Sequence, residues 1–408
     1  MIDTILALNV GSSSLKFALF SVAGDGWPSL LLRGGVEELA TSPRLEMRGA
    51  DGTPLEDVVW EGSRDIDAIL PPLLSAIETK VKDARLVAVG HRVVHGGHDM
   101  SEPQLVTADL LAVLDGLVPL APLHEAQNIS PIRTLSRLRP EFAQVACFDT
   151  AFHGTMPQLA TRLALPRDYE AAGVRRYGFH GLSYEYISRR LEEVSPPLSK
   201  GRVIAAHLGN GASLCALLNG RSIETTMGFS ALDGLVMGTR PGTLDPGVLL
   251  HLLQQKGMTV AQVEDLLYRR SGLLGVSGNM ASDMRVLLAS THAHAREAID
   301  LFVYRCACQI GSLATALNGL DGIVFTAGIG EHSPVIRKSV CERLQWLGVT
   351  IDEDANSSNA PLISTKASSV EVRIVPTDEE AMIAYHTRAR LQDLQAAPSN
   401  TIKNAPLP

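Results

Sequence analysis

Two segments of this chain share one pattern, an Asn/Gly/Ser turn between two apolar runs of strand length. The first spans Leu8 to Leu15, and the second spans Leu208 to Leu214 in the other half of the chain. A duplicated strand-turn-strand unit explains the similarity most economically, although Asn-Gly alone is also a common hairpin signal. A duplication within 408 residues predicts two related domains with a cleft between them.

Apolar runs of strand length alternate with amphipathic helical patterns along the whole chain. The helical pattern is clearest from Ile299 to Leu317, and Ser333-Pro334 is typical of a helix start. This alternation predicts an α/β fold. The runs that we predict to be strands are 5–8, 15–20, 86–89, 145–148, 203–206, 214–218, 323–325 and 370–375.

The composition is that of a globular protein without a nucleic-acid partner. The formal net charge is −8 and the basic residues are dispersed, whereas proteins that bind a phosphate backbone normally have a basic face. The first residues lack the basic segment of a signal peptide, and Asn9 and Gly11 interrupt the first apolar run. We therefore expect a cytoplasmic protein with no membrane partner. The five cysteines lack zinc-type spacing and are expected to be reduced.

The first turn, from Asn9 to Lys16, has the residues of a phosphate-binding turn. Its glycine permits close approach, Ser12 and Ser14 supply hydroxyl groups, and Lys16 supplies a positive charge. It is not a Walker loop, because the segment continues as a strand instead of opening a helix. We expect a β-hairpin in which the amide oxygen of Asn9 is suited to Mg²⁺ or its bound waters.

Two later glycine-rich segments, 207–211 and 325–331, each follow a predicted strand, and the second precedes a helix start that suits a nucleotide. Arg92 and Arg240 also lie among glycines, in segments 90–97 and 237–242. A lone loop arginine is usually a solvated surface residue. Two of them in a chain with phosphate turns are suited to clamping a carboxylate and a transferring phosphoryl group.

Asp149 directly follows a predicted strand, and His180 directly precedes a helical pattern. Both positions suit site residues, but a turn aspartate and a packed core histidine are the simpler interpretations from the residues alone. Near the end of the chain, Thr377 or Asp378 is expected to cap the final helix. A carboxylate at that junction is also suited to Mg²⁺, opposite Asn9.

Five motifs, taken in order, resemble those of the acetokinase family within the actin-like, sugar-kinase and heat-shock ATPase superfamily. The resemblance covers the chain from about Ile5 to Arg390, and five ordered matches make it highly specific. The motifs are Asn-Val-Gly-Ser-Ser-Ser-Leu-Lys at 9–16, Gly-His-Arg-Val-Val-His-Gly-Gly at 90–97, Phe-Asp-Thr-Ala-Phe-His at 148–153, His-Leu-Gly-Asn-Gly-Ala-Ser at 207–213 and Thr-Ala-Gly-Ile-Gly-Glu at 326–331.

The resemblance implies two ribonuclease-H-like domains, each a βββαβαβα unit, with the active site between them. An N-terminal acetokinase domain is expected at 1–149 plus 381–408, and a C-terminal nucleotide-binding and dimerisation domain at 150–380. The implied activity is reversible transfer of the γ-phosphoryl group of ATP to acetate, which gives acetyl phosphate and ADP. A homodimer with Mg²⁺ or Mn²⁺ as cofactor is implied as well. Such transfer depends mainly on positioning and on charge neutralisation.

The resemblance also assigns catalytic roles. Arg92 and Arg240 clamp the substrate and transition state, His180 stabilises the transferring phosphoryl group, and Asp149 is the acid/base. Because acetate is already ionised at neutral pH, we expect Asp149 instead to orient an arginine or magnesium-bound waters.

The remaining matches concern the metal, the acyl group and the nucleotide. Asn9 and Glu379 match the metal positions, with Glu380 as the alternative to Glu379, and Val94 and Leu123 match the walls of the acyl pocket. The positions that match nucleotide contacts are Lys16, His207, Leu208, Gly209, Asn210, Gly211, Asp283, Met284, Arg285, Gly328, Ile329, Gly330, Glu331 and His332.

Two other functions remain open at this point. A propionate or butyrate kinase of the same family would use the same groups with a roomier pocket at Val94 and Leu123. An actin-like or chaperone-like ATPase would share the phosphate turns but would not need Arg92, His180 and Arg240 together. We predict that those three residues converge in one cleft.

Overall fold

The structure is a computed structural model, and it describes residues 1–11, 14–24, 26–39, 42–62, 65–118 and 125–396. The chain divides into two compact units, Met1–Ala151 with Asp378–Pro408 and Phe152–Thr377. Within the described ranges, no helix combines the length and the apolar character that a membrane crossing requires.

The first unit contains an eight-stranded mixed sheet with the strand order β5-β4-β3-β2-β1-β6-β8-β7. Strands β1, β6 and β8 run parallel, so their carboxyl ends meet at one edge of the sheet. The strands are β1 (Ile2–Val10), β2 (Leu15–Ser21), β3 (Ser29–Glu37), β4 (Arg44–Gly49), β5 (Pro54–Val59), β6 (Ala84–Val93), β7 (Gln104–Leu105) and β8 (Ala143–Phe148).

Helices cover both faces of this sheet. Alternate strand residues such as Leu6, Leu8 and Val89 pack against α1 (Ile66–Lys80) and α3 (Glu125–Leu138). Helix α2 (Ala108–Leu117) packs beside α3. The next residue of β6, Gly90, faces α16 (Glu379–Ala396), and a Cβ there would lie 2.2 Å from Thr387 Oγ1. The glycine therefore lets the C-terminal helix lie directly on the sheet.

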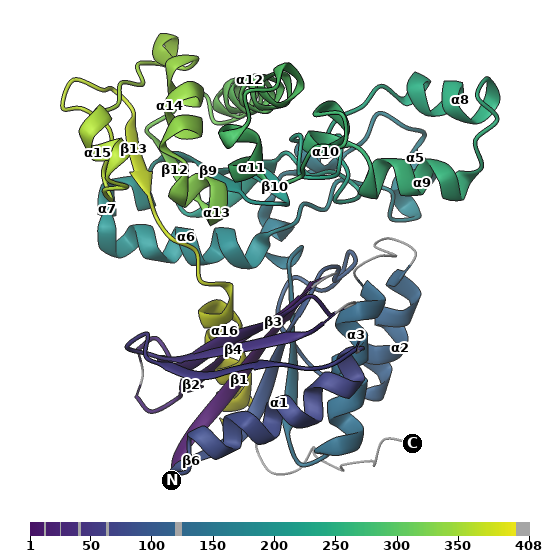
Figure 1. Ribbon diagram of the computed structural model, residues 1–408, viewed down its shortest axis with the longest axis vertical. Coiled ribbons are helices and arrows are strands. Elements are labelled where there is room, and N and C mark those ends of the chain that lie inside the picture. Colours follow the sequence, from purple (N-terminus) through teal and green to yellow (C-terminus); the bar gives the residue numbers. More distant parts are fainter. Residues whose placement is uncertain (12–13, 25, 40–41, 63–64, 119–124, 397–408) are drawn as a thin grey trace. The chain divides into compact units, whose positions relative to one another are not determined.

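The second unit contains a five-stranded mixed sheet with the order β11-β10-β9-β12-β13. Strands β9, β12 and β13 run parallel. Helix α6 (Gly181–Val194) packs on one face through Tyr184, Ile187 and Leu191, and α12 (Ala293–Ala316) covers the other (Figure 1). The strands are β9 (Arg202–Leu208), β10 (Ala212–Leu218), β11 (Arg221–Thr225), β12 (Gly322–Thr326) and β13 (Glu371–Ile374).

The other helices of the second unit are mostly short. They are η2 (Ala151–Thr155), which begins at the unit boundary, α4 (Gln158–Thr161), α5 (Arg167–Ala171), α7 (Pro196–Ser199), α8 (Pro246–Gln254), α9 (Val260–Arg269), α10 (Gly272–Val276), α11 (Met284–Ala289), α13 (Ala327–His332), α14 (Pro334–Glu342), η3 (Gln345–Leu347) and α15 (Glu353–Ser357).

The two sheets share one topology, which confirms the α/β fold and its duplicated arrangement. The order β3-β2-β1-β6-β8 in the first unit matches β11-β10-β9-β12-β13 in the second, with antiparallel pairing followed by parallel pairing in both. Seven of the eight runs that were predicted to be strands lie within strands, and the eighth, 370–375, extends one residue beyond β13 at each end. The sequence interpretation missed β3, β4, β5, β7 and β11.

The structure refines two local predictions. The glycine-rich segment 325–331, which was expected to follow a strand and precede a helix, includes the end of β12 and most of the short helix α13. Ser333 occupies the N-cap position of α14 and Pro334 begins the helix, but the serine side chain makes no capping hydrogen bond. The final helix is capped as expected, because Asp378 Oδ1 accepts a hydrogen bond of 2.9 Å from Ala381 N.

Candidate active site

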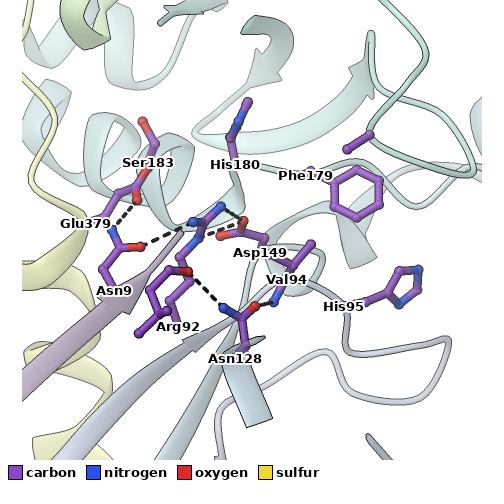
Figure 2. A network of polar contacts seen from close by, with 12 residues as sticks. Asn9, Arg92, Val94, His95, Asn128, Asp149, Phe179, His180, Ser183 and Glu379 are labelled. Carbon is purple, nitrogen blue, oxygen red and sulfur yellow. Dashed lines mark hydrogen bonds and ion pairs between the residues drawn. The ribbon is translucent and has the colours of Figure 1, made fainter. Parts of the chain in front are cut away.

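Three predicted site residues gather at the carboxyl edge of the first sheet. Asn9 lies on β1, Arg92 on β6, and Asp149 directly after β8. Arg92 donates two hydrogen bonds to Asp149 Oδ2, from Nε at 3.0 Å and from Nη2 at 2.5 Å. Its Nη1 donates to Asn9 Oδ1 at 3.2 Å (Figure 2). The guanidinium is therefore held in one orientation from two neighbouring strands.

The electrostatic environment keeps Arg92 charged. Its side chain is 18% exposed, and that of Asp149 is 1% exposed. Burial alone would lower the pKa of Arg92, but the charges of Asp149 and Glu379 together with the hydrogen bonds to Asp149 raise it above its ordinary value. This contact fits the expectation that Asp149 orients an arginine.

The first turn of α16 brings two carboxylates to the same edge. Asn9 Nδ2 donates to Glu379 Oε2 at 2.9 Å and to Glu380 Oε1 at 3.0 Å. Burial raises the pKa of Glu380, and the charges of Glu379 and Asp378 raise it further. The side-chain amide of Asn9 thus accepts from Arg92 through its oxygen and donates to both glutamates through its nitrogen.

This donor set fits a magnesium ion. Mg²⁺ usually takes one or two carboxylates and completes its coordination with water and substrate phosphate oxygens. Within the ranges that the structure describes, no group of three or more His, Cys, Asp or Glu residues is arranged to hold a metal. Glu379 and Glu380 would hold the ion together with its bound waters, and the amide oxygen of Asn9 accepts a hydrogen bond from Arg92 Nη1.

The hairpin of β1 and β2 forms as predicted, with Asn9 opposite Lys16. The positive charge of Lys16 acts on Glu380 and partly offsets the rise in its pKa. In the turn, Gly11 N donates to Ser14 O at 2.8 Å. Val94 is buried directly after β6. Ser12 and Leu123, which were also predicted to be site residues, lie outside the described residues.

Sequence reasoning missed two residues of α3 that bind the end of β6. Asn128 Oδ1 accepts a hydrogen bond from Val94 N at 3.0 Å, and Glu125 Oε2 accepts one from His95 N at 3.1 Å (Figure 2 shows Asn128). The sequence did contain a signal for Asn128. It lies four residues before Ile132, so a polar residue occupies the apolar face of the helix.

In the second unit, two predicted histidines stack on each other. The ring centroids of His180 and His207 are 4.2 Å apart, with an interplanar angle of 17°. His180 Nδ1 lies 2.8 Å from Ser213 Oγ, and His207 Nδ1 lies 2.8 Å from Ser183 Oγ. His180 has the positive φ of 60° and stands at the N-cap of α6, which directs its ring towards β9 and β10. The sequence interpretation gave no role to either serine.

Arg240 belongs to the same cluster. A Cβ on Gly211 would lie 2.8 Å from Arg240 Nη2 and 3.2 Å from His180 Nε2, so a side chain at this position would have to displace the ends of both residues. The Arg240 loop is joined to the turn after β9 by a hydrogen bond of 3.0 Å from Gly238 N to Asn210 O. The glycine-rich turn therefore brings the second arginine and the histidines together.

The other predicted nucleotide-contacting segments adjoin this turn. Thr326 pairs with His207, which places α13 and its residues Gly328, Ile329 and Gly330 beside the end of β9. Ser282 O would lie 3.3 Å from a Cβ on Gly238, which places Asp283, Met284 and Arg285 close to the Arg240 loop. The predicted nucleotide-contacting segments of the second unit thus lie around the end of β9 and the turn that follows it, from Leu208 to Gly211.

Charged side chains in these segments already have protein partners. Asp283 pairs with Arg285 at 2.6 Å and caps α11, which lowers the pKa of Asp283. Glu331 Oε1 accepts hydrogen bonds from Ala327 N at 2.7 Å and from Thr377 N at 3.1 Å. His332 is 75% exposed. The Glu331 carboxylate therefore joins the start of α13 to the backbone of Thr377.

Comparisons with known proteins agree with these features. Residues 4–385 match the acetokinase family. The chain belongs to the acetokinase family. It is 53% identical over 390 residues to the acetate kinase of Rhodopseudomonas palustris (strain TIE-1), which covers 95% of this chain and 98% of that protein.

Two solved structures are also similar over almost their whole length. A propionate kinase from Francisella tularensis subsp. tularensis SCHU S4 matches with a TM-score of 0.86 and 37% identity, covering 94% of this chain and 99% of the other. The acetate kinase of Porphyromonas gingivalis matches with a TM-score of 0.82 and 37% identity, covering 95% and 100%. The family assignment therefore rests on sequence and fold alike.

Proposed function

We propose that the protein is an acetate kinase, which transfers the γ-phosphoryl group of ATP reversibly to acetate and releases ADP. The observation that carries this conclusion is full-length membership of the acetokinase family, together with the oriented arginine of the first unit. Because ATP is the co-substrate, we place the reaction in the cytoplasm. By the same family resemblance we propose that the protein acts as a homodimer.

In the proposed mechanism, an acetate oxygen attacks the γ-phosphorus while the bond to the leaving oxygen of ADP breaks. The acetate is already ionised, so no proton has to be removed. Arg92, fixed by Asp149 and Asn9, binds the carboxylate, and Val94 lies against its methyl group. Asp149 thus acts through Arg92.

The second unit supplies the remaining positive charge in this proposal. Arg240 and His180 stabilise the charge on the transferring phosphoryl oxygens, and the segments around the end of β9 bind the nucleotide. Glu379 and Glu380, with Asn9 beside them, would hold Mg²⁺ with its bound waters, and the ion would supply positive charge to the phosphate chain. We assign the acceptor to the domain at 1–149 plus 381–408, and the nucleotide and the dimer contact to the domain at 150–380.

A hydroxylamine-trapping assay tests the proposal directly. The purified protein is incubated with ATP, Mg²⁺ and acetate, propionate or butyrate in parallel, and the acyl phosphate is measured as its hydroxamate. We expect the highest kcat/KM with acetate. No acyl phosphate with any acid, alongside ATP hydrolysis, would instead fit the ATPase alternative.

Propionate is the second candidate acceptor, because the similar Francisella tularensis structure is described as a propionate kinase. One methylene group changes binding in an apolar pocket by only about 1–3 kcal/mol. A higher kcat/KM with propionate than with acetate would therefore change the substrate but keep the mechanism.

A further inference from the structure

The parallel strands β1 and β6 stop pairing with each other just before their site residues. Their register ends at Leu8 opposite His91. Each strand nevertheless continues to pair with its other neighbour. Val10 of β1 pairs with Leu15 of β2, and Val93 of β6 pairs with Phe148 of β8. The two strands therefore separate at the point where Asn9 and Arg92 project.

The side-chain amide of Asn128 lies between these separated strand ends. Its Oδ1 accepts from Val94 N at 3.0 Å, and its Nδ2 donates to Val10 O at 2.9 Å (Figure 2). Asn128 is 1% exposed. Without its amide, Val94 N and Val10 O would lose this hydrogen-bond partner in a buried position. One amide group thus replaces the direct hydrogen bonding that ends at Leu8 and His91.

A second contact from the same helix turn supports this arrangement. Glu125 precedes Asn128 by three residues, which places both on one face of α3. Glu125 Oε2 accepts from His95 N at 3.1 Å. Two consecutive peptide N–H groups, those of Val94 and His95, are therefore held by side chains of α3.

We propose that Asn128 is a positioning residue for the acceptor side of the reaction. It sets the distance between the strand ends that carry Asn9 and Arg92, whose side chains are in contact at 3.2 Å, and it fixes the backbone of Val94. This inference rests on the proposed function, because it assigns the acceptor carboxylate to Arg92. It predicts a defect in acceptor use without a defect in nucleotide binding.

The test compares Asn128→Leu, which removes both hydrogen bonds at similar volume, with the milder Asn128→Ser. Thr134→Val is the matched control, because Thr134 is a buried residue of α3 whose hydroxyl donates to Asp67 at 2.5 Å, away from the strand ends. The measurements are Tm, the Kd for ADP, and kcat and KM for acetate and for ATP.

We expect both Asn128 variants to lose about 10- to 100-fold in kcat/KM for acetate, as is typical when reacting groups are misplaced by about 1 Å. The Kd for ADP should stay within twofold of that of the unaltered protein. Thr134→Val should lose a similar amount of stability but keep its kcat/KM. If Asn128→Leu does not fold, Asn128→Ser gives the same comparison.

Two results would overturn the inference. Asn128 variants that match Thr134→Val in kcat/KM for acetate would show a purely structural role, as would an equal loss of ADP affinity. An unaltered protein that makes no acyl phosphate would instead remove the proposed function, and with it the inference.

Discussion

Arg92 and Asp149 form a two-point contact in which the Nε and Nη2 groups of the arginine both donate to Oδ2 of the aspartate. The carboxylate is nearly inaccessible to solvent, whereas the arginine retains some exposure. Such a pair fixes the plane of the guanidinium and leaves its remaining N–H groups directed elsewhere. The geometry therefore favours orientation of Arg92 over proton transfer as the task of Asp149.

The first prediction follows from that contact. Asp149→Asn should lower kcat about 100-fold or more, because a neutral amide neither fixes nor neutralises the buried guanidinium. The pH–rate profile should keep its shape, since no proton is transferred through this residue. Rates of acyl phosphate formation between pH 5.5 and pH 9 check this. Loss of one limb of the profile would show that Asp149 is an acid/base.

The control is the surface pair of Arg44 and Asp57, in which Nε donates to Oδ1 and Nη2 donates to Oδ2, and both side chains are about half exposed. Exposed ion pairs contribute little, about 0–1 kcal/mol. Asp57→Asn should leave kcat unchanged.

The second prediction concerns the metal. Glu379→Gln should raise the Mg²⁺ concentration for half-maximal activity about 10-fold or more, and Glu380→Gln should raise it less. Binding of Mn²⁺ in the presence of ADP, measured by electron paramagnetic resonance, gives a readout that does not depend on turnover. Asp393→Asn, at an exposed position of the same helix, should change neither quantity. A larger effect of Glu380→Gln would make Glu380 the principal ligand.

The sequence was sufficient for those parts of the fold that have strong local signals. The strands with continuous apolar runs and the Asn9 hairpin were predicted because periodicity and turn chemistry are local properties. Strands β3 to β5 were missed because exposed residues interrupt their apolar positions, which include the buried Leu32 of β3 and Leu45 of β4. Gly34 on β3 obscured the pattern further, although its backbone lies so close to the Phe17 ring that a Cβ would be 2.5 Å away.

The candidate site shows the same division. Arg92, Asp149 and Arg240 were found because each lies in a distinctive glycine-rich or strand-end motif. Asn128 was missed because its role depends on where two strands separate, which is a long-range property. Ser213 was missed for a similar reason, since a serine within an apolar strand gives no indication that it supports His180.

The third prediction tests the close approach at the turn after β9. Gly211→Ala should lower kcat about 10-fold or more, because the new methyl group would displace the ends of Arg240 and His180. The backbone of Gly211 does not have a positive φ, so the fold should tolerate alanine. Steady-state kinetics and Tm, measured together, separate the two effects. Gly116→Ala is the control, because a Cβ at Gly116 meets nothing within 4 Å.

The last prediction uses the buried carboxyl of Glu125. Burial raises its pKa to about 8, although the hydrogen bond from His95 N opposes the rise, and the charge of Asp149 adds to it. Among the described residues, its Oε1 atom has no hydrogen-bond partner. Glu125 is therefore neutral in the folded protein at pH 7 and ionised in the unfolded chain, so the folded state binds the additional proton.

The contribution of Glu125 to the free energy of unfolding should consequently fall by about 1 kcal/mol per pH unit as the pH rises from about 4.5 to about 8. Above about pH 8 this contribution should stay constant. Burial lowers the pKa of His91, His95 and His153 to about 4, so these residues act in the opposite direction and only below about pH 6.5. The range from pH 6.5 to pH 8.5 separates Glu125 from these histidines.

Glu125→Gln cannot ionise and keeps an oxygen that accepts from His95 N. Its stability relative to the unaltered protein should therefore increase between pH 6.5 and pH 8.5, as measured by urea unfolding at each pH. Glu102→Gln, at an exposed position, should show no such trend. A difference between Glu125→Gln and the unaltered protein that is constant across this range would mean that Glu125 is already ionised at pH 6.5. The carboxylate would then stand beside the acetate site as a charge that repels the acceptor, which a KM for acetate lowered by Glu125→Gln at pH 7 would reveal.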